Sequence, residues 1–361
     1  MIEQVAAAFE RHDYHTAAEL LKQLLKESPQ NPWGQFYLGR LQEVSGKLEA
    51  AEKIYRQLLR DTTNGKIVAQ ARQGLQRVQA IEQEQRSSAV AQATADPSNA
   101  ELGVLVLEPV TSEIKTVVAP KFAQIMQIDP YTARLVLPSR GWRLYRTGAI
   151  GELRFLGERL CSVGIPCFWV TLAEIQKIRV FQVSYFQSTA PQATVVCQSE
   201  QRQVGSLTFN WSEVTQRVTG LLPIFEEVVD VNYRRQLERK TQTQDYAQFC
   251  DLHLPKRCCI LRLHDNCYQF QQGAALAPQP SQRSNQTTTR INWNSLLTFL
   301  NQQLPQARVW SDFTFFADTV LDQTELLGRI QSHVHLFRRD DTSWDPAFHL
   351  YSGIVFVKNS R

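Results

Sequence analysis

Four cysteines and two histidines lie close together in the C-terminal half of the chain, and they are the residue types best suited to bind a metal. They are Cys250, His253, Cys258, Cys259, His264 and Cys267. Three or four such thiolate and imidazole ligands make a tetrahedral zinc site. In a β-strand, however, residues three apart point to opposite faces, which separates Cys250 from His253 and His264 from Cys267. Since no Cys-x-x-Cys pair occurs, the pattern favours thiols that fill a core. We therefore expect no metal or other cofactor, with a zinc site or thiol sensor as an alternative.

A second group of polar residues follows near the C-terminal end. His333 and His335 would share one face of an expected strand, and Asp340, Asp341 and Asp345 come after it, which is an arrangement for a metal or a general base. Surface histidines followed by an Asp-rich turn are the more common explanation. The motifs G-x-S-x-G, H-E-x-x-H, G-x-x-x-x-G-K and G-x-G-x-x-G do not occur. We therefore expect a protein that is not an enzyme.

A short basic run, Arg234, Arg235, Arg239 and Lys240, has the charge needed to contact RNA, phosphates or an anionic membrane surface. Glu238 interrupts it, and no aromatic stacking platform lies beside it, so a solvated helix face explains it as well. The net charges of residues 1–101, 102–176 and 177–361 are −1, +2 and +3, from 12, 8 and 19 basic and 13, 6 and 16 acidic side chains. Nucleic acid is therefore not the expected partner, whereas peripheral membrane association stays open.

Length and composition indicate a globular protein of two or three domains. The chain has 361 residues, 43% of them hydrophobic and 20% charged. Its first residues lack the basic and apolar regions of a signal peptide, and no run of about 18 apolar residues predicts a membrane span. The seven cysteines show no disulfide framework. Together these features favour a cytoplasmic location with reduced thiols.

Residues 31–63 show the clearest pattern in the chain. Leu38 and Gly39 are followed by Gly46, Ala51, Tyr55 and Leu58. Small residues at Gly39 and Ala51 would let two antiparallel helices approach closely, with Tyr55 and Leu58 filling the seam. Residues 34 positions before Ala51, Tyr55 and Leu58 are Ala17, Leu21 and Leu24. This order resembles the tetratricopeptide repeat, whose period is about 34 residues.

The resemblance implies a surface that binds another protein through the first helix of each repeat. By position, the partner-binding residues would be Trp33, Phe36, Arg40 and Glu43, with Gln70 and Arg77 on the next helix. Trp33 and Phe36 would anchor a partner by burying aromatic area. Packing of these aromatic rings within the chain itself is the competing interpretation.

The chain then divides into four expected segments. Residues 1–81 form the all-α tetratricopeptide-like module. Residues 82–101, which lack aromatic residues, form a linker, for which a helical start is left open. Residues 102–174 read as a small α/β module with the order β-α-α-β-α-β. That order resembles the C-terminal domain of the ribosomal stalk protein and the Clp-protease adaptor fold, which implies protein docking; no site residues transfer, because residues 103–172 contain no histidine.

Residues 175–361 read as a β-rich α+β domain with a mobile loop at 272–290. Strands are expected at 178–186, 193–197, 204–211, 221–230, 249–254, 258–263, 333–337 and 349–357, and an aromatic run, which alternates less cleanly, lies at 309–316. Helices are expected at 212–218, 291–304 and 324–332.

These observations predict a multi-domain, non-catalytic adaptor, assembly or regulatory protein that binds a partner protein. Its composition and short helical module are typical of bacterial proteins of this kind. A ribosome- or nucleic-acid-associated factor is the first alternative.

Overall fold

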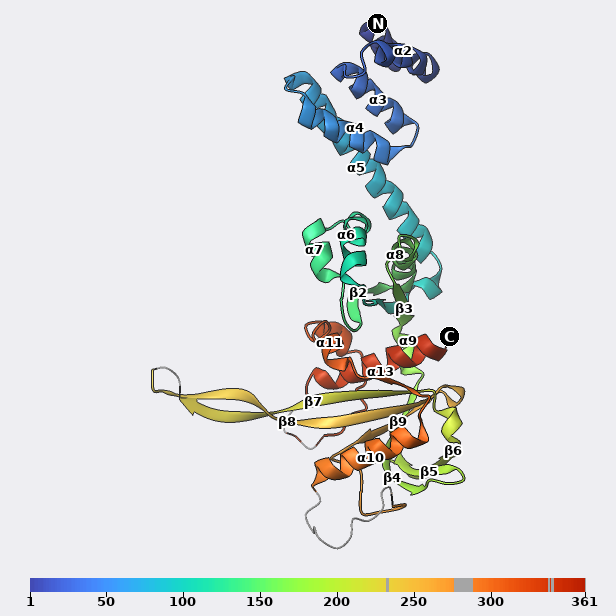
Figure 1. Cartoon of the computed structure of the whole chain (residues 1–361), viewed down its shortest axis with the longest axis vertical. Helices are drawn as coiled ribbons and strands as arrows, with labels where there is room; N and C mark the ends of the chain where they lie inside the picture. The colour runs from blue at the N-terminus through green and yellow to red at the C-terminus, as the bar shows by residue number, and fades with distance from the viewer. Residues whose placement is uncertain (232–233, 276–287, 337, 339–340, 361) are drawn as a thin grey trace. The chain divides into compact units, whose positions relative to one another are not determined.

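A computed structural model describes residues 1–231, 234–275, 288–336, 338 and 341–360. Tyr233, Asp340 and residues 276–287 of the expected loop lie outside the described residues. The chain divides into two compact units, Met1–Ala93 and Thr94–Arg361, called here the N-terminal and the C-terminal unit. Figure 1 shows helices alone in the first and two β-sheets in the second. Among the described residues, no helix combines the length and apolar character needed to cross a membrane.

The N-terminal unit is a stack of antiparallel helices. They are α1 (Ile2–Glu10), α2 (Tyr14–Glu27), α3 (Pro32–Val44), α4 (Leu48–Asp61) and α5 (Gly65–Thr94), whose last residue belongs to the next unit. Side chains set the starts: Asp13 accepts a hydrogen bond from the Thr16 amide, and Asn31 accepts from the amides of Trp33 and Gly34. Pro32 occupies the first turn of α3, where its missing N–H costs nothing.

Tyr55 is the centre of this stack, as the spacing predicts. Its ring is fully buried, as is Ala51. A Cβ atom added to Gly39 would lie 2.7 Å from the Tyr55 ring, and one added to Gly74 would lie 2.6 Å from it. The two glycines therefore allow α3 and α5 to approach the ring from opposite sides.

The expected linker at residues 82–101 is helical over most of its length. Helix α5 continues to Thr94, and a short 3₁₀ helix, η1 (Pro97–Ala100), follows. Gln, Arg and Ala have high helix propensity, and neither Gly nor Pro interrupts the segment before Pro97. The helical start that the sequence left open for this segment therefore extends to Thr94.

The C-terminal unit begins with a small sheet in the predicted order β-α-α-β-α-β. Its elements are β1 (Leu102–Leu107), α6 (Ser112–Met126), α7 (Pro130–Val136), β2 (Arg143–Ala149), α8 (Ile150–Ser162) and β3 (Cys167–Thr171). The strand order is β2-β1-β3, with both pairs antiparallel. The apolar sides of α6 and α8 pack together with Leu105 and Leu107 of the central strand.

A seven-stranded sheet, the large sheet, follows in the order β10-β7-β8-β9-β4-β5-β6. The strands are β4 (Arg179–Ser188), β5 (Ala193–Gln198), β6 (Val204–Phe209), β7 (Gln216–Val231), β8 (Leu237–Leu254), β9 (Cys259–His264) and β10 (Arg308–Trp310). Only the pairs β10–β7 and β4–β9 are parallel among the described strands. Around it lie α9 (Leu172–Gln176), η2 (Trp211–Glu213), η3 (Pro255–Arg257), α10 (Thr289–Gln303), α11 (Phe313–Ala317), α12 (Thr324–Leu327) and α13 (Trp344–Ser360).

Helices cover both faces of the large sheet. Trp293, Leu296 and Leu300 of α10 pack on one face, and Figure 1 shows α11 and α13 on the other. The second face shares one hydrophobic cluster with Val104, Val106 and Val170 of the small sheet. The two expected modules 102–174 and 175–361 are therefore packed on a common core.

Three sequence-based expectations for this unit are wrong. Residues 349–357 lie in helix α13 and not in a strand. Because this helix is buried on all sides, its residues form a continuous apolar run, and such a run does not distinguish a buried helix from a buried strand. The expected helix 212–218 is only the turn η2, because β7 starts at Gln216 between β10 and β8. The aromatic run at 309–316, for which no helix or strand was predicted, divides between β10 and α11. The described part of 333–337 is not a strand.

Candidate protein-binding surfaces

The residues expected to bind a partner divide into buried and accessible ones. Phe36 is 3% exposed and packs 6.1 Å from the Tyr55 ring. This burial contradicts a role for Phe36 as an exposed anchor, because the ring already fills the module's own core. Trp33 is half-buried beside Phe36, and Gln70 is exposed on α5. The accessible part of the expected surface therefore centres on Trp33 and Gln70.

Glu43 and Arg77 form an ion pair with each other inside the N-terminal unit. The Arg77 guanidinium donates to Glu43 at 2.7 and 3.1 Å, and the Tyr55 hydroxyl donates to Glu43 at 2.8 Å. Burial by itself raises the pKa of Glu43, but the hydrogen bonds from Arg77 and Tyr55 outweigh it and lower that pKa. The two residues lie 34 positions apart, which is one repeat, so the spacing contained a signal for this pair.

Arg40 completes a basic surface beside that pair. Its guanidinium carbon lies 5.6 Å from the centre of the Phe9 ring, and its Nε atom has no hydrogen-bond partner among the described residues. Because Glu43 compensates one of the two arginines, Arg40 and Arg77 leave one net positive charge beside Glu43, toward the C-terminal end of α3 from Trp33.

The cysteine and histidine group is divided between the two faces of the large sheet. Cys250 packs with the apolar residues under α10, whereas the His253 Nε2 lies 3.0 Å from the Ser352 Oγ of α13 on the other face. Burial raises the pKa of the Cys250 thiol to about 12 and lowers that of His253 to about 4. Cys258 and Cys267 are exposed, and His264 stacks on Phe249. No group of three or more potential ligands occurs among the described residues.

A buried polar network, which the sequence did not indicate, lies on the α13 face. Arg262 and Asp251 are both fully buried, and the guanidinium donates to both carboxylate oxygens at 2.9 and 2.8 Å. The Ser352 hydroxyl donates to Asp251 at 2.6 Å. Arg262 also donates to the backbone carbonyls of Ser332 and His333. The network is fully desolvated, and it ties β8 and β9 to α13 and to the segment before it.

The histidines near the C-terminal end belong to the same region. The rings of His333 and His349 lie 4.6 Å apart, and His333 Nδ1 is 3.5 Å from Glu200. Asp345 pairs with Arg338. Burial lowers the pKa of His333 to about 4, which makes it a poor general base near neutral pH.

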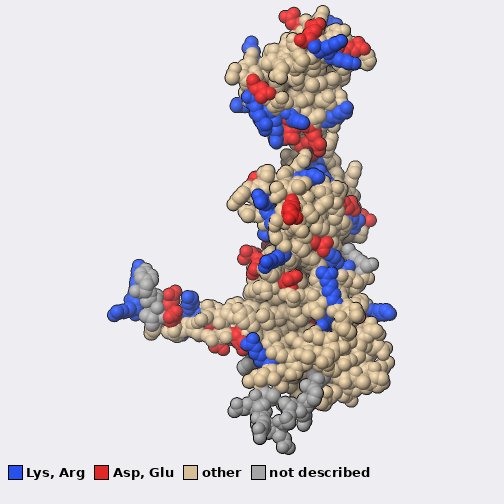
Figure 2. All heavy atoms as spheres, viewed as in Figure 1, with Lys and Arg blue, Asp and Glu red and all other residues tan. Residues whose placement is uncertain are grey.

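The basic run lies on a long β-hairpin and not on a helix. Arg239 and Lys240 belong to β8, and Arg234 and Arg235 precede that strand. Figure 2 shows acidic side chains among these basic ones on the projecting hairpin. Residues 226–245 contain five acidic and four basic side chains, so the hairpin does not present the uniform positive charge that nucleic-acid binding requires.

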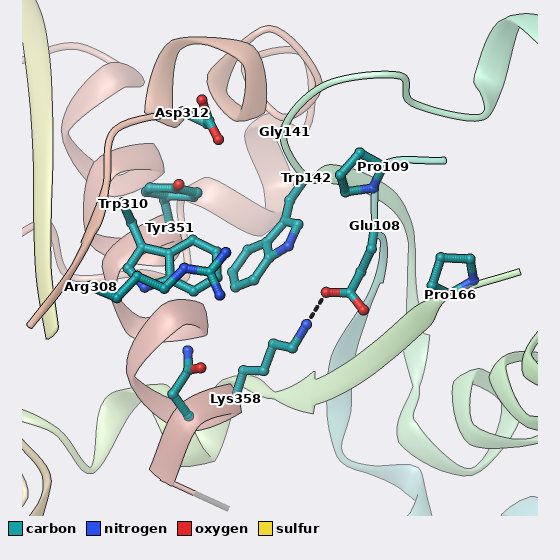
Figure 3. Close-up of a pocket in the computed structure, with 11 residues that line it drawn as sticks. Glu108, Pro109, Gly141, Trp142, Pro166, Arg308, Trp310, Asp312, Tyr351 and Lys358 are labelled. Carbon is teal, nitrogen blue, oxygen red and sulfur yellow. Dashed lines mark hydrogen bonds and ion pairs between the residues drawn. The ribbon is translucent and has the colours of Figure 1, made fainter. Parts of the chain in front are cut away.

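A pocket of about 320 Å³ lies where the small sheet meets the large one. Trp142 and Trp310 form its aromatic wall, with ring centres 4.7 Å apart. Lys358 pairs with Glu108, as Figure 3 shows, and its Nζ lies 4.9 Å from the Trp142 ring centre. Arg308 covers Trp310 at 3.8 Å. These contacts come from four segments far apart in the sequence, and they hold the two sheets together.

Comparison with known proteins gives one match. A family model of the tetratricopeptide repeat matches residues 8–73, which cover the end of α1, all of α2, α3 and α4, and the start of α5. No curated protein matches the chain, and no solved structure does. The resemblance of residues 102–174 to the ribosomal stalk domain and the Clp-protease adaptor fold stays a prediction.

Proposed function

We propose that the chain is a non-catalytic adaptor whose N-terminal unit binds a segment of another protein. The observation that carries this proposal is the tetratricopeptide match over residues 8–73, since such repeats generally mediate protein–protein interaction. Stacked helix pairs present an extended surface to a partner, and the surface is formed by successive repeats. The adaptor role also agrees with the C-terminal unit, where the polar cluster of Asp251, Arg262 and Ser352 is buried and already paired.

The accessible side chains indicate which kind of partner segment fits. Trp33 offers half-buried aromatic area, and Arg40 and Arg77 lie close enough to Glu43 to act on its charge. An apolar side chain followed by a carboxylate would pack on Trp33 and pair with the Arg40 guanidinium, since Arg77 is already paired with Glu43. We therefore expect an apolar and acidic segment.

The test compares two matched double variants of the full chain. Trp33→Ala/Gln70→Ala changes the accessible part of the surface, and Lys53→Ala/Arg60→Ala changes exposed residues of α4. Both variants and the wild type are used to capture proteins from the native host, and captured proteins are identified by mass spectrometry. The proposal expects one protein that the wild type and the α4 variant retain and the Trp33/Gln70 variant loses.

Two other outcomes would contradict the proposal. Retention of the same protein by all three forms would place the binding surface outside the Trp33 region. Capture of RNA without a specific protein would favour the nucleic-acid alternative. Circular dichroism of each variant checks that the helices are intact.

A further inference from the structure

The strands β7 and β8 extend far beyond the rest of the large sheet (Figure 1). β10 pairs with β7 only at Gln216–Val218, and β9 pairs with β8 only at Phe249–Leu254. Beyond these positions, β7 and β8 pair with each other alone among the described strands. We call residues 224–231 and 234–245 the arm. A two-stranded ribbon is marginally stable by itself, so an arm of this length gains from packing on something else.

Two apolar side chains on the arm are directed to solvent. Val229 is 64% exposed and Leu237 is 78% exposed. Val229 lies opposite Arg239 in the ladder, and Leu237 is two residues from Arg239, so all three point to the same side. Phe225 and Glu227 of β7 share that side. We call it the Val229 face.

The opposite face of the arm differs in character. It contains Glu226, Val228 and Asp230 on β7, with Lys240 opposite Val228 and Glu238 opposite Asp230. Like charges directly opposite each other destabilise a ladder. Apolar side chains of high exposure, by contrast, lie on the Val229 face, and this face is the better candidate for contact with a protein.

The charged residues of the arm indicate which kind of molecule can bind the Val229 face. Five acidic and four basic residues between 226 and 245 leave a net charge of −1, which disfavours a polyanion or an anionic membrane. The face carries one acid, Glu227, and one base, Arg239, which lie only 3.8 Å apart and are 48% and 79% exposed. Exposed pairs of this kind contribute little, so the pair between Glu227 and Arg239 does not prevent contact of these side chains with a second chain.

We propose that the Val229 face binds the same face of a second copy of this chain, with the two arms antiparallel. A two-fold axis between the levels of Glu227 and Val229 brings Arg239 of each copy to Glu227 of the other. The same axis brings Leu237 of each copy to Phe225 of the other. Such an isologous contact is self-complementary, because every ion pair and every apolar contact occurs twice. It does not depend on the function proposed for the N-terminal unit.

The consequence is a bivalent molecule. Two arms in contact bury a small area, and contacts of this size are weak and concentration-dependent. A dimer nevertheless carries two N-terminal units; on the function proposed for that unit, a partner with two binding segments is held by both. Loss of the dimer weakens binding to such a partner without changing the binding of a single segment.

Sedimentation velocity of the full chain over about a hundredfold range of concentration tests the proposal. Arg239→Glu places like charges against Glu227 of the second copy, and we expect dimerisation at least about tenfold weaker. Lys240→Glu is the matched control, since it makes the same charge change at the next residue on the opposite face. It leaves dimerisation unchanged. Leu237→Asp abolishes the dimer.

An exchange of charges makes the test specific. Glu227→Lys alone also weakens the dimer, but a mixture of the Arg239→Glu and Glu227→Lys variants forms a heterodimer, because each cross-contact again joins opposite charges. A wild type that stays monomeric at all concentrations overturns the proposal. So does a dimer that Arg239→Glu and Leu237→Asp leave intact, or one that Lys240→Glu weakens equally. Failure of the mixture to dimerise overturns the antiparallel arrangement.

Discussion

Tyr55 shows how single residues determine the packing of the N-terminal unit. Its ring is enclosed by Gly39 and Gly74, and its hydroxyl donates to Glu43. The sequence predicted the ring and one glycine, because Gly39 and Tyr55 belong to one repeat pattern. Gly74 was not singled out, since a glycine inside a helical stretch has no pattern of its own. Its role appears only when the neighbouring helix is in place.

This packing gives the first prediction. Gly74→Ala should improve the helix propensity of α5 by about 1 kcal/mol. The new Cβ would, however, lie 2.6 Å from the Tyr55 ring, and overpacking of this kind costs about 1–3 kcal/mol. We therefore expect a net loss of stability, measured by urea unfolding of the full chain followed by circular dichroism.

Gly65→Ala is the control for that measurement. It lies in the same helix, and an added Cβ meets no atom within 4 Å. Its stability should equal or exceed that of the wild type. Equal unfolding curves for the two alanine variants would show that Tyr55 does not restrict the approach of α5.

At the scale of elements, the sequence predicted most helices and strands but not those whose form depends on their neighbours. The order of the small sheet followed from caps and periodicity, such as Asp129 before Pro130 at the start of α7. Helix α13 was missed, because a helix buried all round has no polar face to give a period. The two faces of β8 were predicted correctly from alternation, and that separated Cys250 from His253.

The polar network between β8, β9 and α13 could not be predicted from the sequence, and the reason is a different one. Asp251, Arg262 and Ser352 come from three elements, and no spacing rule links them. The charges of Arg262 and Asp251 both act on His253 and His264, and the charge of Arg262 acts on His349. Burial, the largest cause, lowers the pKa of His264 to about 3 and that of His349 well below its usual value.

A pH dependence of stability follows from these histidines. In the unfolded chain, histidine titrates near pH 6.5, whereas the folded-state pKa of His253 is about 4. The unfolded chain therefore binds protons that the folded chain excludes, and the free energy of unfolding decreases as the pH falls below about 6.5. The slope reaches about 1.4 kcal/mol per pH unit for each such histidine. Urea unfolding between pH 7.5 and about 5 measures it.

His264→Phe isolates one contribution to that slope. Neither ring nitrogen of His264 has a hydrogen-bond partner among the described residues, and its ring stacks on Phe249 at 4.9 Å. Phenylalanine keeps this contact, so the variant should be at least as stable near neutral pH and lose the acid sensitivity of one histidine. His15→Gln, at an exposed position of α2, is the control. An unchanged slope in His264→Phe would show that this ring is protonated in the folded protein.

At the scale of the whole molecule, the C-terminal unit contains two sheets that the sequence placed in separate modules. One hydrophobic cluster contains Val104 and Val170 of the small sheet and Ile354 of α13. The Leu144 amide also donates to the Thr319 hydroxyl at 3.1 Å. Composition and turn signals marked the boundary near residue 174 but gave no information on the surface shared across it.

Trp142 is the residue on which this shared core can be tested. Its ring lies 4.9 Å from Phe168 of β3 and 4.7 Å from Trp310 of β10, so it contacts both sheets. Replacement of a buried tryptophan by alanine costs about 3–5 kcal/mol. Because the two sheets share this side chain, the wild-type C-terminal unit should unfold in one calorimetric transition. Trp142→Ala should divide this transition into two, with the small sheet unfolding first.

Tyr131→Ala is the control, at a position of α7 that is 74% exposed, and it should leave one transition. Independent unfolding of the small sheet in the wild type would mean that the common core does not couple the two sheets.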